Sequence, residues 1–335
     1  MSTQKRMNCA VFGLGRLGSQ HAANLAGRVA GAKLAGVADP VKEARERFTA
    51  QFSGIDAAAD YRELLERRDI DAVVIATATN THVGIIVDAL DAGKAVFCEK
   101  PVTLDLSEAA KVRDALDKTK GFLMVGFMRR FDDAYMYGKK QIDSGTLGEP
   151  VYVNCVGRDP AAPPIEYAKV SGGLVLDMSI HDIDLARWFL GGDVKRVVAQ
   201  GGVLMCEELK PIGDIDHINI LFEYRNGRLA QLEASRNARY GYDIRTEVIC
   251  TKGAVFIGDM RQTHTVVLNK NGMMSDTVPE FRTRFDKAYL NEIERFIVDV
   301  AAGKEPSPNI DDGVAAVELS FAANKALSTK MPVDV

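Results

Sequence analysis

The chain has 335 residues, of which 47% are hydrophobic and 26% are charged, and its formal net charge is −4. This balance is typical of a globular protein with one large domain or two ordinary ones, long enough to bury a sizeable core. The slightly acidic charge and the lack of a basic stripe argue against nucleic acid or a membrane surface as a partner.

Nothing in the sequence indicates a membrane anchor or an oxidising compartment. No stretch approaches the roughly 20 apolar residues of a spanning helix, and the start MSTQKRMNCAVFG leads into a glycine turn rather than a cleavage site. The five cysteines lie far apart and form neither a CxxC pair nor a zinc spacing. We therefore expect reduced, mostly buried thiols and a cytoplasmic location.

The first 125 residues alternate short apolar runs with helical patterns. Helices are predicted at 16–27, 40–52, 81–93, which ends at Gly93, and 107–119, with Ser107 as the candidate N-cap. Buried strands are predicted between them, at 8–15, 33–39, 71–79, 95–101 and 122–131. Strand–helix alternation of this kind predicts a parallel sheet with helices on both faces.

The first turn, GLGRLG, has the GxGxxG spacing at Gly13, Gly15 and Gly18. It follows a predicted strand and begins a predicted helix, which is the context in which this motif binds a dinucleotide. We expect Gly13 to permit the tight turn and Gly15 to let a pyrophosphate approach the backbone. Gly18 is expected to let the helix pack closely on the strand.

Asp39 ends the second predicted strand, about 20 residues after the glycine turn. A carboxylate there accepts hydrogen bonds from both ribose hydroxyls and repels a 2′-phosphate, so NAD is favoured over NADP. The alternative is a turn aspartate before a proline, which is common. Arg16 lies inside the glycine turn and can pair with a phosphate, which leaves some tolerance of NADP open.

The pattern changes after about residue 125. Period-two alternation, broken by NG and KG turns, indicates a largely antiparallel sheet. Its apolar residues lie on both phases, which predicts an oligomer interface on the sheet face that the helices of the domain leave uncovered. The strands are predicted at 150–160, 194–205, 216–226, 228–238, 244–260 and 264–270, with helices at 132–143, 286–303 and 313–328.

We therefore predict an α/β protein with two domains. Residues 1–125 are expected to form a dinucleotide-binding Rossmann domain with a parallel sheet. Residues 126–335 are expected to form an α+β domain with a large open antiparallel sheet, for substrate binding and oligomerisation. The last helix is expected to pack back on the first domain.

The segment CEKP places Glu99 and Lys100 at the carboxyl end of a buried parallel strand, where open α/β sheets bind ligands. A lysine there can hydrogen-bond a substrate oxygen and stabilise a developing alkoxide. A salt bridge at the strand end, or a solvated lysine, is the alternative.

The segment DMSIHDIDLARW places Asp177, His181 and Asp184 on one face of a predicted helix. Such a face suits a metal site, a proton-transfer site or a solvated surface. The spacing matches no known short zinc motif on a helix and no cysteine is near, which argues against a metal. A histidine suits the removal of a hydroxyl proton near pH 7, and a carboxylate one turn earlier can orient its ring or bind the substrate.

Taken together, these motifs resemble the Gfo/Idh/MocA oxidoreductase family. The resemblance rests on GLGRLG at 13–18, ATATNTH at 76–82, CEKP at 98–101, GFMRRFD at 126–132 and GGLVLDMSIHDIDLARW at 172–188. It implies a Rossmann domain followed by an α/β domain with a large open antiparallel sheet, often a tetramer through that sheet. It also implies NAD(P)-dependent hydride transfer on a sugar or cyclitol.

Within the family, GFMRRFD, DxxxHDID and RNARYGYD are most similar to the inositol 2-dehydrogenases. That resemblance implies Lys100, Asp177 and His181 as the catalytic residues, with His181 as the general base. It implies hydroxyl ligands at Arg130, Asp159, Asp184 and Tyr242, although RDPAAPP around Asp159 departs from the expected segment. Tyr240 and Tyr242 alternate along the chain, so only one of them can face the site.

The expected cofactor is NAD, held by Gly13, Gly15, Arg16, Leu17, Gly18, Asp39, Thr77, Asn80, His82, Glu99 and Lys100. His82 can line the cofactor cleft or serve only in packing. The expected function is oxidation of myo- or scyllo-inositol by a homotetramer. An aldose dehydrogenase of the same family and a non-catalytic NAD-binding regulator are the alternatives.

Overall fold

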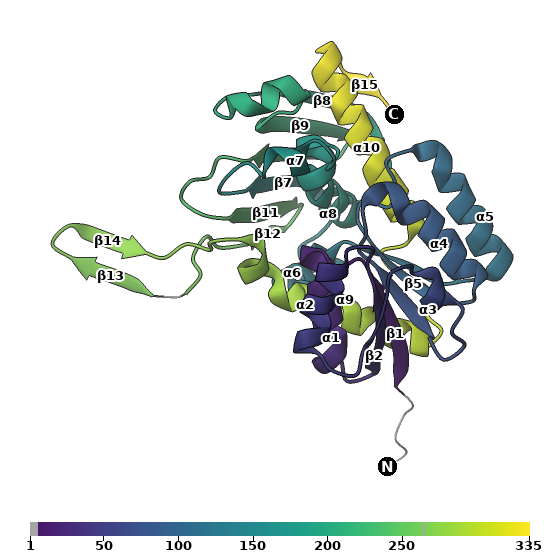
Figure 1. Cartoon of the computed structure of the whole chain (residues 1–335). Coiled ribbons are helices and arrows are strands. Elements are labelled where there is room, and N and C mark those ends of the chain that lie inside the picture. Colours follow the sequence, from purple (N-terminus) through teal and green to yellow (C-terminus); the bar gives the residue numbers. More distant parts are fainter. Residues whose placement is uncertain (1–5, 264) are drawn as a thin grey trace. The chain divides into compact units, whose positions relative to one another are not determined.

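The computed structural model of the chain describes residues 6–263 and 265–335 and divides into two compact units (Figure 1). Unit 1 comprises Met1–Met128 and Lys287–Ala315, and unit 2 comprises Arg129–Asp286 and Ala316–Val335. The helices α9 (Phe281–Ala301) and α10 (Ile310–Thr329) contribute residues to both. His264, the first residue of the strand predicted at 264–270, lies outside the described residues.

Unit 1 is built on a six-stranded sheet in which every neighbouring pair is parallel. Its central strands are fully buried because helices cover both faces, and this explains their continuous apolar runs. The strand order changes direction between β1 and β4, which is where such sheets bind ligands. In spatial order the strands are β3 (Asp56–Ala58), β2 (Ala32–Ala38), β1 (Met7–Phe12), β4 (Ala72–Ile75), β5 (Ala95–Glu99) and β6 (Leu123–Gly126).

The helices of unit 1 lie on both faces of the sheet, with α1 and α2 on one side and α4 and α5 on the other (Figure 1). The first turns of α10, with Ile310 and Val314, join the apolar core beside α4 and α5. The helices are α1 (Arg16–Gly27), α2 (Lys42–Gln51), α3 (Arg62–Leu65), α4 (His82–Asp91) and α5 (Ala109–Thr119), with short 3₁₀ turns η1 (Thr79–Thr81) and η2 (Leu106–Glu108).

Three local predictions for unit 1 were wrong. Ser107 does not cap a helix, because the Asp105 side chain accepts a hydrogen bond from the Ser107 backbone N–H at 2.9 Å and caps η2 instead. The strand predicted at 122–131 ends at Gly126, and η3 (Met128–Phe131) takes over its second half. The strand predicted at 71–79 ends at Ile75.

Unit 2 is built on a seven-stranded sheet that is antiparallel except where β10 pairs in parallel with β7. The predicted, largely antiparallel sheet is confirmed, and β15 adds a short edge strand that the sequence did not suggest. In spatial order the strands are β12 (Gly253–Ile257), β11 (Asp243–Cys250), β7 (Pro150–Arg158), β10 (Leu229–Ser235), β9 (His217–Tyr224), β8 (Val194–Gly202) and β15 (Val333–Asp334). A separate hairpin pairs β13 (Val266–Asn269) with β14 (Gly272–Ser275).

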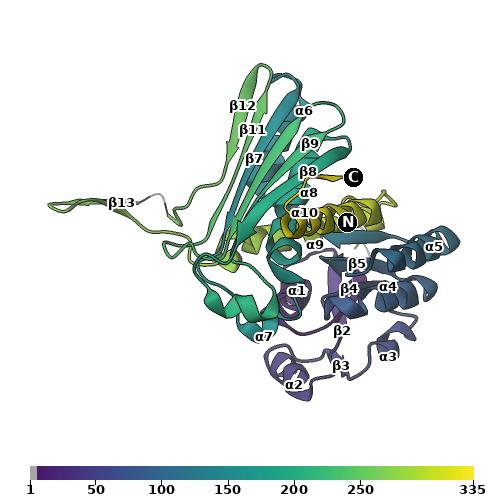
Figure 2. The ribbon, with the colours of Figure 1, turned by 90° about the horizontal axis from the view of Figure 1, so that it is seen from above.

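The two faces of this sheet differ in burial. Along β9, Ile218, Ile220 and Phe222 are buried while Leu221 between them is 45% exposed. The buried face carries α8 (Ile180–Leu190), and Figure 2 shows this helix on one side of the sheet. The other helical segments of unit 2 are α6 (Asp133–Asp143), α7 (Ile165–Ala168), the π-helical turn η4 (Val175–Ser179) and η5 (Glu207–Ile212).

The cysteines agree with the expected buried thiols. All five are free, and four of them are buried. Within the described part of the chain, every helix is too short or too polar to span a bilayer.

Candidate active site

The predicted cofactor residues of unit 1 follow the carboxyl ends of neighbouring parallel strands. The glycine turn follows β1, Asp39 follows β2, Thr77 and Asn80 follow β4, and Lys100 follows β5. Because parallel strands end at the same edge of a sheet, these residues lie along one rim.

The three glycines of GLGRLG have different surroundings. Gly13 has φ +88°, and a Cβ atom there would lie 2.5 Å from the Ala76 carbonyl oxygen. A Cβ at Gly18 would lie 1.9 Å from the Gly13 carbonyl oxygen, so close packing of α1 on the turn requires glycine. A Cβ at Gly15 would meet nothing within 4 Å. Gly15 is exposed, so its backbone is open to a ligand.

Helix α1 has no side-chain cap at its N-terminus. Gly15 is its N-cap and supplies no side-chain hydrogen bond, and no acidic residue lies in its first turn. Arg16 is exposed at this end and Leu17 is half-buried. The N–H groups of the first turn and the positive end of the helix dipole therefore suit an anion such as a pyrophosphate.

Asp39 is tied to the glycine turn. One carboxylate oxygen accepts the Leu14 N–H at 2.6 Å, and the other accepts the Val41 N–H at 2.8 Å. These bonds hold the carboxylate beside the turn, at the position where an acidic residue meets a ribose.

His82 connects two of the predicted motifs inside unit 1. Its side chain is 1% exposed. Nδ1 lies 2.9 Å from the Pro101 carbonyl oxygen, and Nε2 lies 3.2 Å from that of Thr77. Burial lowers the pKa of His82, which favours the neutral ring. His82 thus joins the CEKP and ATATNTH segments inside unit 1, and a role in the cofactor cleft stays a prediction.

Glu99 points into the protein and is 5% exposed. Its carboxylate lies 2.7 Å from His21 Nε2, and the Glu292 carboxylate lies 3.9 Å from the same nitrogen. Glu99 thus contacts His21 inside unit 1, and its predicted contact with the cofactor stays a prediction. Sequence patterns do not reveal this cluster, because its three members lie on α1, β5 and α9.

Burial, with the nearby charge of Glu99, raises the pKa of Glu292 well above its ordinary value of 4.5. Neither oxygen of Glu292 has a hydrogen bond within the described residues. One ligand atom from each of His21, Glu99 and Glu292 lies within 4.8 Å of the others, which is close enough for a shared cation. The raised pKa favours the protonated, neutral form of the Glu292 carboxyl.

In unit 2, Asp177 lies in the π-helical turn η4 rather than in a regular helix. Such turns insert an extra residue and are frequent at functional sites. One oxygen of Asp177 accepts the Tyr167 hydroxyl at 2.9 Å, and the other accepts Arg236 Nη2 at 3.2 Å. His181 follows at the start of α8 and is 8% exposed.

Asp184 and Arg130, both predicted as hydroxyl ligands, are paired with each other. Arg130 Nε and Nη2 donate to the two Asp184 oxygens at 2.8 Å and 2.5 Å. A second pair joins the same two chain segments, in which Arg129 Nη1 donates to Asp182 at 2.5 Å. All four side chains are buried. Asp177 and Asp184 therefore have different arginine partners, although both were expected on one helix face.

Tyr242 and Tyr240 occupy different environments, as their alternation predicts. Tyr242 is 6% exposed and packs edge-on against the Phe285 ring, and burial raises its pKa. The charge of Asp159 raises it further. Tyr240 is 46% exposed, and its hydroxyl contacts Asp243. Tyr242 is thus the inner tyrosine, and an electrostatic interaction joins it to Asp159.

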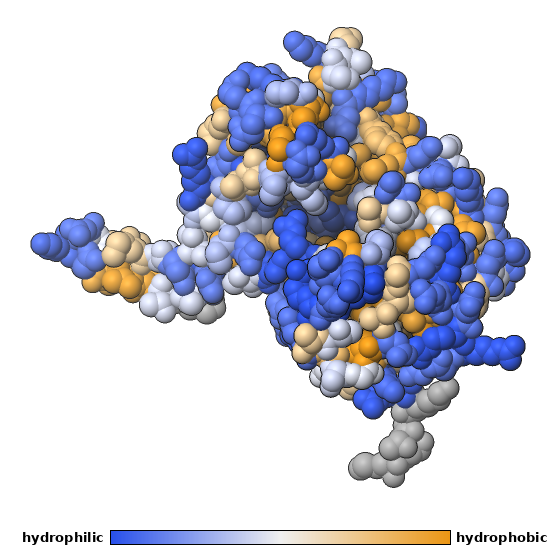
Figure 3. Space-filling view, viewed as in Figure 1, coloured by the Kyte–Doolittle hydropathy of each residue, from blue (hydrophilic) through white to orange (hydrophobic). Residues whose placement is uncertain are grey.

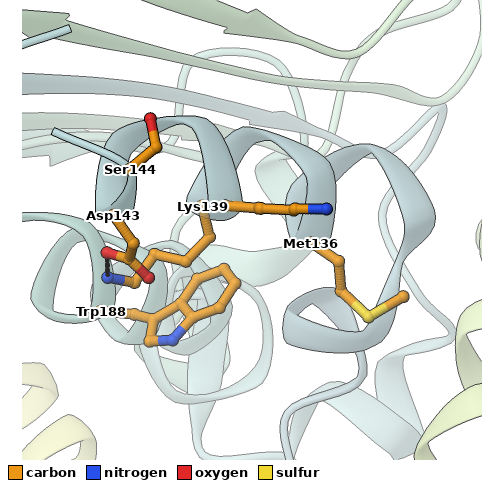
Figure 4. Close-up of a pocket in the computed structure, with 6 residues that line it drawn as sticks. Met136, Lys139, Asp143, Ser144 and Trp188 are labelled. Atoms are coloured by element: carbon orange, nitrogen blue, oxygen red, sulfur yellow. Dashed lines mark hydrogen bonds and ion pairs between the residues drawn. The ribbon is translucent and has the colours of Figure 1, made fainter. Parts of the chain in front are cut away.

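A separate surface pocket of unit 2 contains none of the predicted residues. Figure 4 shows it on α6 and α8, with Lys139 beside the Trp188 ring. Lys139 donates to Asp143 at 2.5 Å. The pocket is shallow, and Lys139 and Asp143 neutralise each other in it, so it is not the candidate site. It is lined by Met136, Lys139, Lys140, Asp143, Ser144 and Trp188.

Two family models match the chain. One is described as the oxidoreductase family with an NAD-binding Rossmann fold and matches residues 7–127. The other is the GFO/IDH/MocA C-terminal domain and matches residues 135–256.

Similar proteins match over nearly the whole chain. The scyllo-inositol 2-dehydrogenase (NAD(+)) of Bacillus subtilis is 41% identical, covering 99% of this chain and 97% of the relative. The myo-inositol 2-dehydrogenase of Thermotoga maritima is 38% identical over 98% of each. The crystal structure of scyllo-inositol dehydrogenase from Lactobacillus casei with bound NAD(H) and scyllo-inositol has a TM-score of 0.93 and 32% identity, and covers 98% of this chain and 99% of its own.

Replacing Gly18 by alanine is expected to destabilise unit 1 by about 1–3 kcal/mol, because the new methyl group collides with the Gly13 carbonyl. Gly15→Ala is the matched control, and its open surroundings predict a change below about 0.5 kcal/mol. Thermal unfolding of both variants without added ligand measures the difference. Equal loss of stability in the two variants would contradict these roles.

Replacing Glu292 by glutamine is expected to flatten the dependence of stability on pH. A carboxyl whose pKa is raised on folding contributes stability that is full below its unfolded pKa and is lost as pH rises through its folded pKa. Glutamine stays neutral, so between pH 5 and 9 the variant should lose less stability than the parent. Urea unfolding across this range checks it, with the half-buried Glu294→Gln as control. An unchanged slope for E292Q would rule out a titrating Glu292.

Proposed function

Since the chain belongs to the GFO/IDH/MocA oxidoreductase family, we propose that it oxidises a secondary hydroxyl of myo- or scyllo-inositol to the ketone, with NAD as the cofactor. The observation that carries the proposal is the likeness, over 98% of the chain, to a structure that holds NAD(H) and scyllo-inositol.

The geometry of unit 1 fits a dinucleotide. The exposed backbone at Gly15 and the uncapped start of α1 would receive the pyrophosphate. Asp39 would accept the ribose hydroxyls, because its carboxylate is already oriented by the turn. Thr77 and Asn80 would meet the cofactor from the same rim. Bound NAD would supply the acceptor for the hydride that leaves the substrate carbon.

The protein itself must accept the proton of the substrate hydroxyl. We assign His181 as the base that takes the hydroxyl proton as the carbon–oxygen double bond forms. Lys100 would donate a hydrogen bond to the reacting oxygen and stabilise its developing negative charge. Asp177 would orient and polarise His181 from the rigid position that Tyr167 and Arg236 give it.

Recognition of a polyol requires several hydrogen-bonding groups, since buried hydroxyls and their partners are costly to leave unpaired. We assign this role to Tyr242, Asp159 and the Arg130–Asp184 pair. An electrostatic interaction joins Tyr242 to Asp159, and the ion pair offers both a donor and an acceptor. Many such groups suit a fully hydroxylated ring better than a small alcohol.

We also infer that the protein is cytoplasmic and forms a homotetramer through the exposed face of the unit 2 sheet. That face carries large apolar side chains in solvent, with Leu221 45%, Val198 43% and Phe256 76% exposed. The hairpin β13–β14 likewise exposes Leu268 and Met273. Figure 3 shows hydrophobic residues in orange on this hairpin. Apolar area of this kind supports contact with another protein surface.

The function is tested by following NAD reduction with myo-inositol, scyllo-inositol, glucose and related aldoses. Turnover is expected on at least one cyclitol, and turnover on aldoses alone would favour an aldose dehydrogenase instead.

His181→Ala should lower kcat by about 10²–10⁴-fold while NADH binding, followed by fluorescence titration, is retained. The control His217→Ala alters a half-buried histidine on β9 and should keep kcat within about twofold. Unchanged turnover in H181A would refute the mechanism.

The assembly is tested by placing a charge on the exposed sheet face. Leu221→Glu should shift the sedimentation profile from tetramer toward smaller species, because a carboxylate in an apolar interface is desolvated without a partner. Leu204→Glu changes a leucine that is 66% exposed in the segment between β8 and η5, and should leave the profile unchanged. A parent protein that sediments as a monomer would remove the inference.

A further inference from the structure

Arg236 is the charged residue that the sequence motifs left without a role. It directly follows β10, at the start of RNARYGYD, and its side chain is 1% exposed. A guanidinium this deeply buried is costly unless its N–H groups are paired with negative charge. Arg236 therefore needs nearby carboxylates, and the structure supplies two.

The two carboxylates belong to Asp214 and Asp177. Arg236 Nη1 donates to Asp214 at 2.5 Å, and Nη2 donates to Asp177 at 3.2 Å. The planar fork of the guanidinium thus divides its two terminal nitrogens between two different acids. A single ammonium group has no such fixed fork and cannot reproduce this arrangement.

Asp214 also fixes the backbone that leads into the π-helical turn. Its Oδ1 accepts the Leu174 N–H at 2.9 Å, immediately before η4, and the Ile215 N–H at 2.8 Å. A Cβ at Gly173 would come within 3.0 Å of the same oxygen. Asp214 therefore locates both Arg236 and the start of the turn that carries Asp177.

Asp177 is held on both of its oxygens as a result. Tyr167 donates to Oδ1 and Arg236 donates to Oδ2, so the plane of the carboxylate is determined. Among Asp177, Asp214 and Arg236, the side chain of Asp177 is the most exposed, at 20% against 6% for Asp214 and 1% for Arg236. Asp177 is thus the most solvent-accessible of the three side chains, and it is the one with a proposed role in the reaction.

We propose that Arg236, anchored by Asp214, is a positioning residue for the reaction: it acts on turnover by orienting the Asp177 carboxylate. This inference rests on the role of Asp177 in the proposed function. A carboxylate that rotates freely orients a neighbouring base less well, and small misplacements of catalytic groups are expensive in rate. Loss of Arg236 should therefore lower kcat while cofactor binding, which is a property of unit 1, persists.

The test is a double-mutant cycle with Arg236→Lys and Asp177→Asn, measured with whichever substrate of the panel gives turnover. R236K retains the positive charge and removes the fork. We expect it to lower kcat about 10–100-fold in the parent, with KM and the NADH dissociation constant changed less than about threefold. In the D177N background the same change should lower kcat less than about threefold, because the carboxylate it orients is gone.

The outcomes separate the inference from the proposed function. If R236K lowers kcat by the same factor in both backgrounds, Arg236 acts independently of Asp177 and the inference is overturned, while the role of Asp177 stands. If D177N keeps full turnover, the role of Asp177 fails, and the inference fails with it. Absence of turnover on every cyclitol removes only the substrate assignment, because the cycle can be measured on an aldose.

Two further variants guard against a simple folding defect. Arg284→Lys changes another ion pair of unit 2, between Arg284 and Asp132 at 2.7 Å, and should keep kcat within about twofold. If R236K does not fold, as judged by thermal unfolding, Asp214→Asn replaces it in the cycle. That variant retains Arg236 and weakens its anchor, so we expect it to lower kcat about 3–10-fold in the parent. In the D177N background it should cause no further loss of kcat. Additive losses would overturn the inference.

Discussion

The interior of unit 2 depends on the pairing of buried charge. Three aspartates of the η4–α8 segment each contact a different arginine: Asp177 with Arg236, Asp182 with Arg129, and Asp184 with Arg130. Breaking a buried pair by removing one partner typically costs about 3–5 kcal/mol, because the other charge is left without compensation. The three arginines come from two other segments of the chain, so these ion pairs connect α8 to η3, and η4 to the residue that follows β10.

The strand pairing of unit 2 positions one of these arginines. The parallel pairing of β10 with β7 places Ser235 opposite Arg158, at the end of the strand after which Arg236 enters the interior. The backbone N–H of Arg236 then donates to the Asp216 carbonyl oxygen at 2.9 Å, and Asp216 precedes β9. The strand pairing thus places the Arg236 side chain next to Asp214 and Asp177. Local sequence preference alone gives no reason for an arginine there.

Local patterns predicted those parts of the fold that depend on neighbours in sequence. The helix at 16–27 has the predicted bounds, because the glycine turn starts it and its apolar period continues to the end. The different demands on Gly13, Gly15 and Gly18 also followed from the motif. The family and the NAD-dependent chemistry were predicted because their motifs are short and continuous.

Contacts between residues far apart in the sequence could not be predicted from local patterns. Glu99 and Lys100 are adjacent, yet Glu99 turns inward to contact His21 on another element. The cap predicted at Ser107 was wrong for a local reason, because Asp105 starts the 3₁₀ turn η2 by accepting the Ser107 N–H. The π-helical turn at Asp177 could not be predicted, because its sequence pattern does not differ from that of a regular helix. The acid–arginine pairs of α8 join residues more than 50 positions apart.

Pairing also bears on how a polyol would be recognised. Single buried charges waiting for a substrate would destabilise the protein in its absence, whereas Arg130 and Asp184 neutralise each other when no hydroxyl is present. A hydroxyl group is both donor and acceptor, so it could share hydrogen bonds with both members of the pair without breaking it. An anion or a cation would have to compete with one member of the pair for the other. In the proposed site, such a pair would therefore favour neutral, hydroxyl-rich molecules over charged ones.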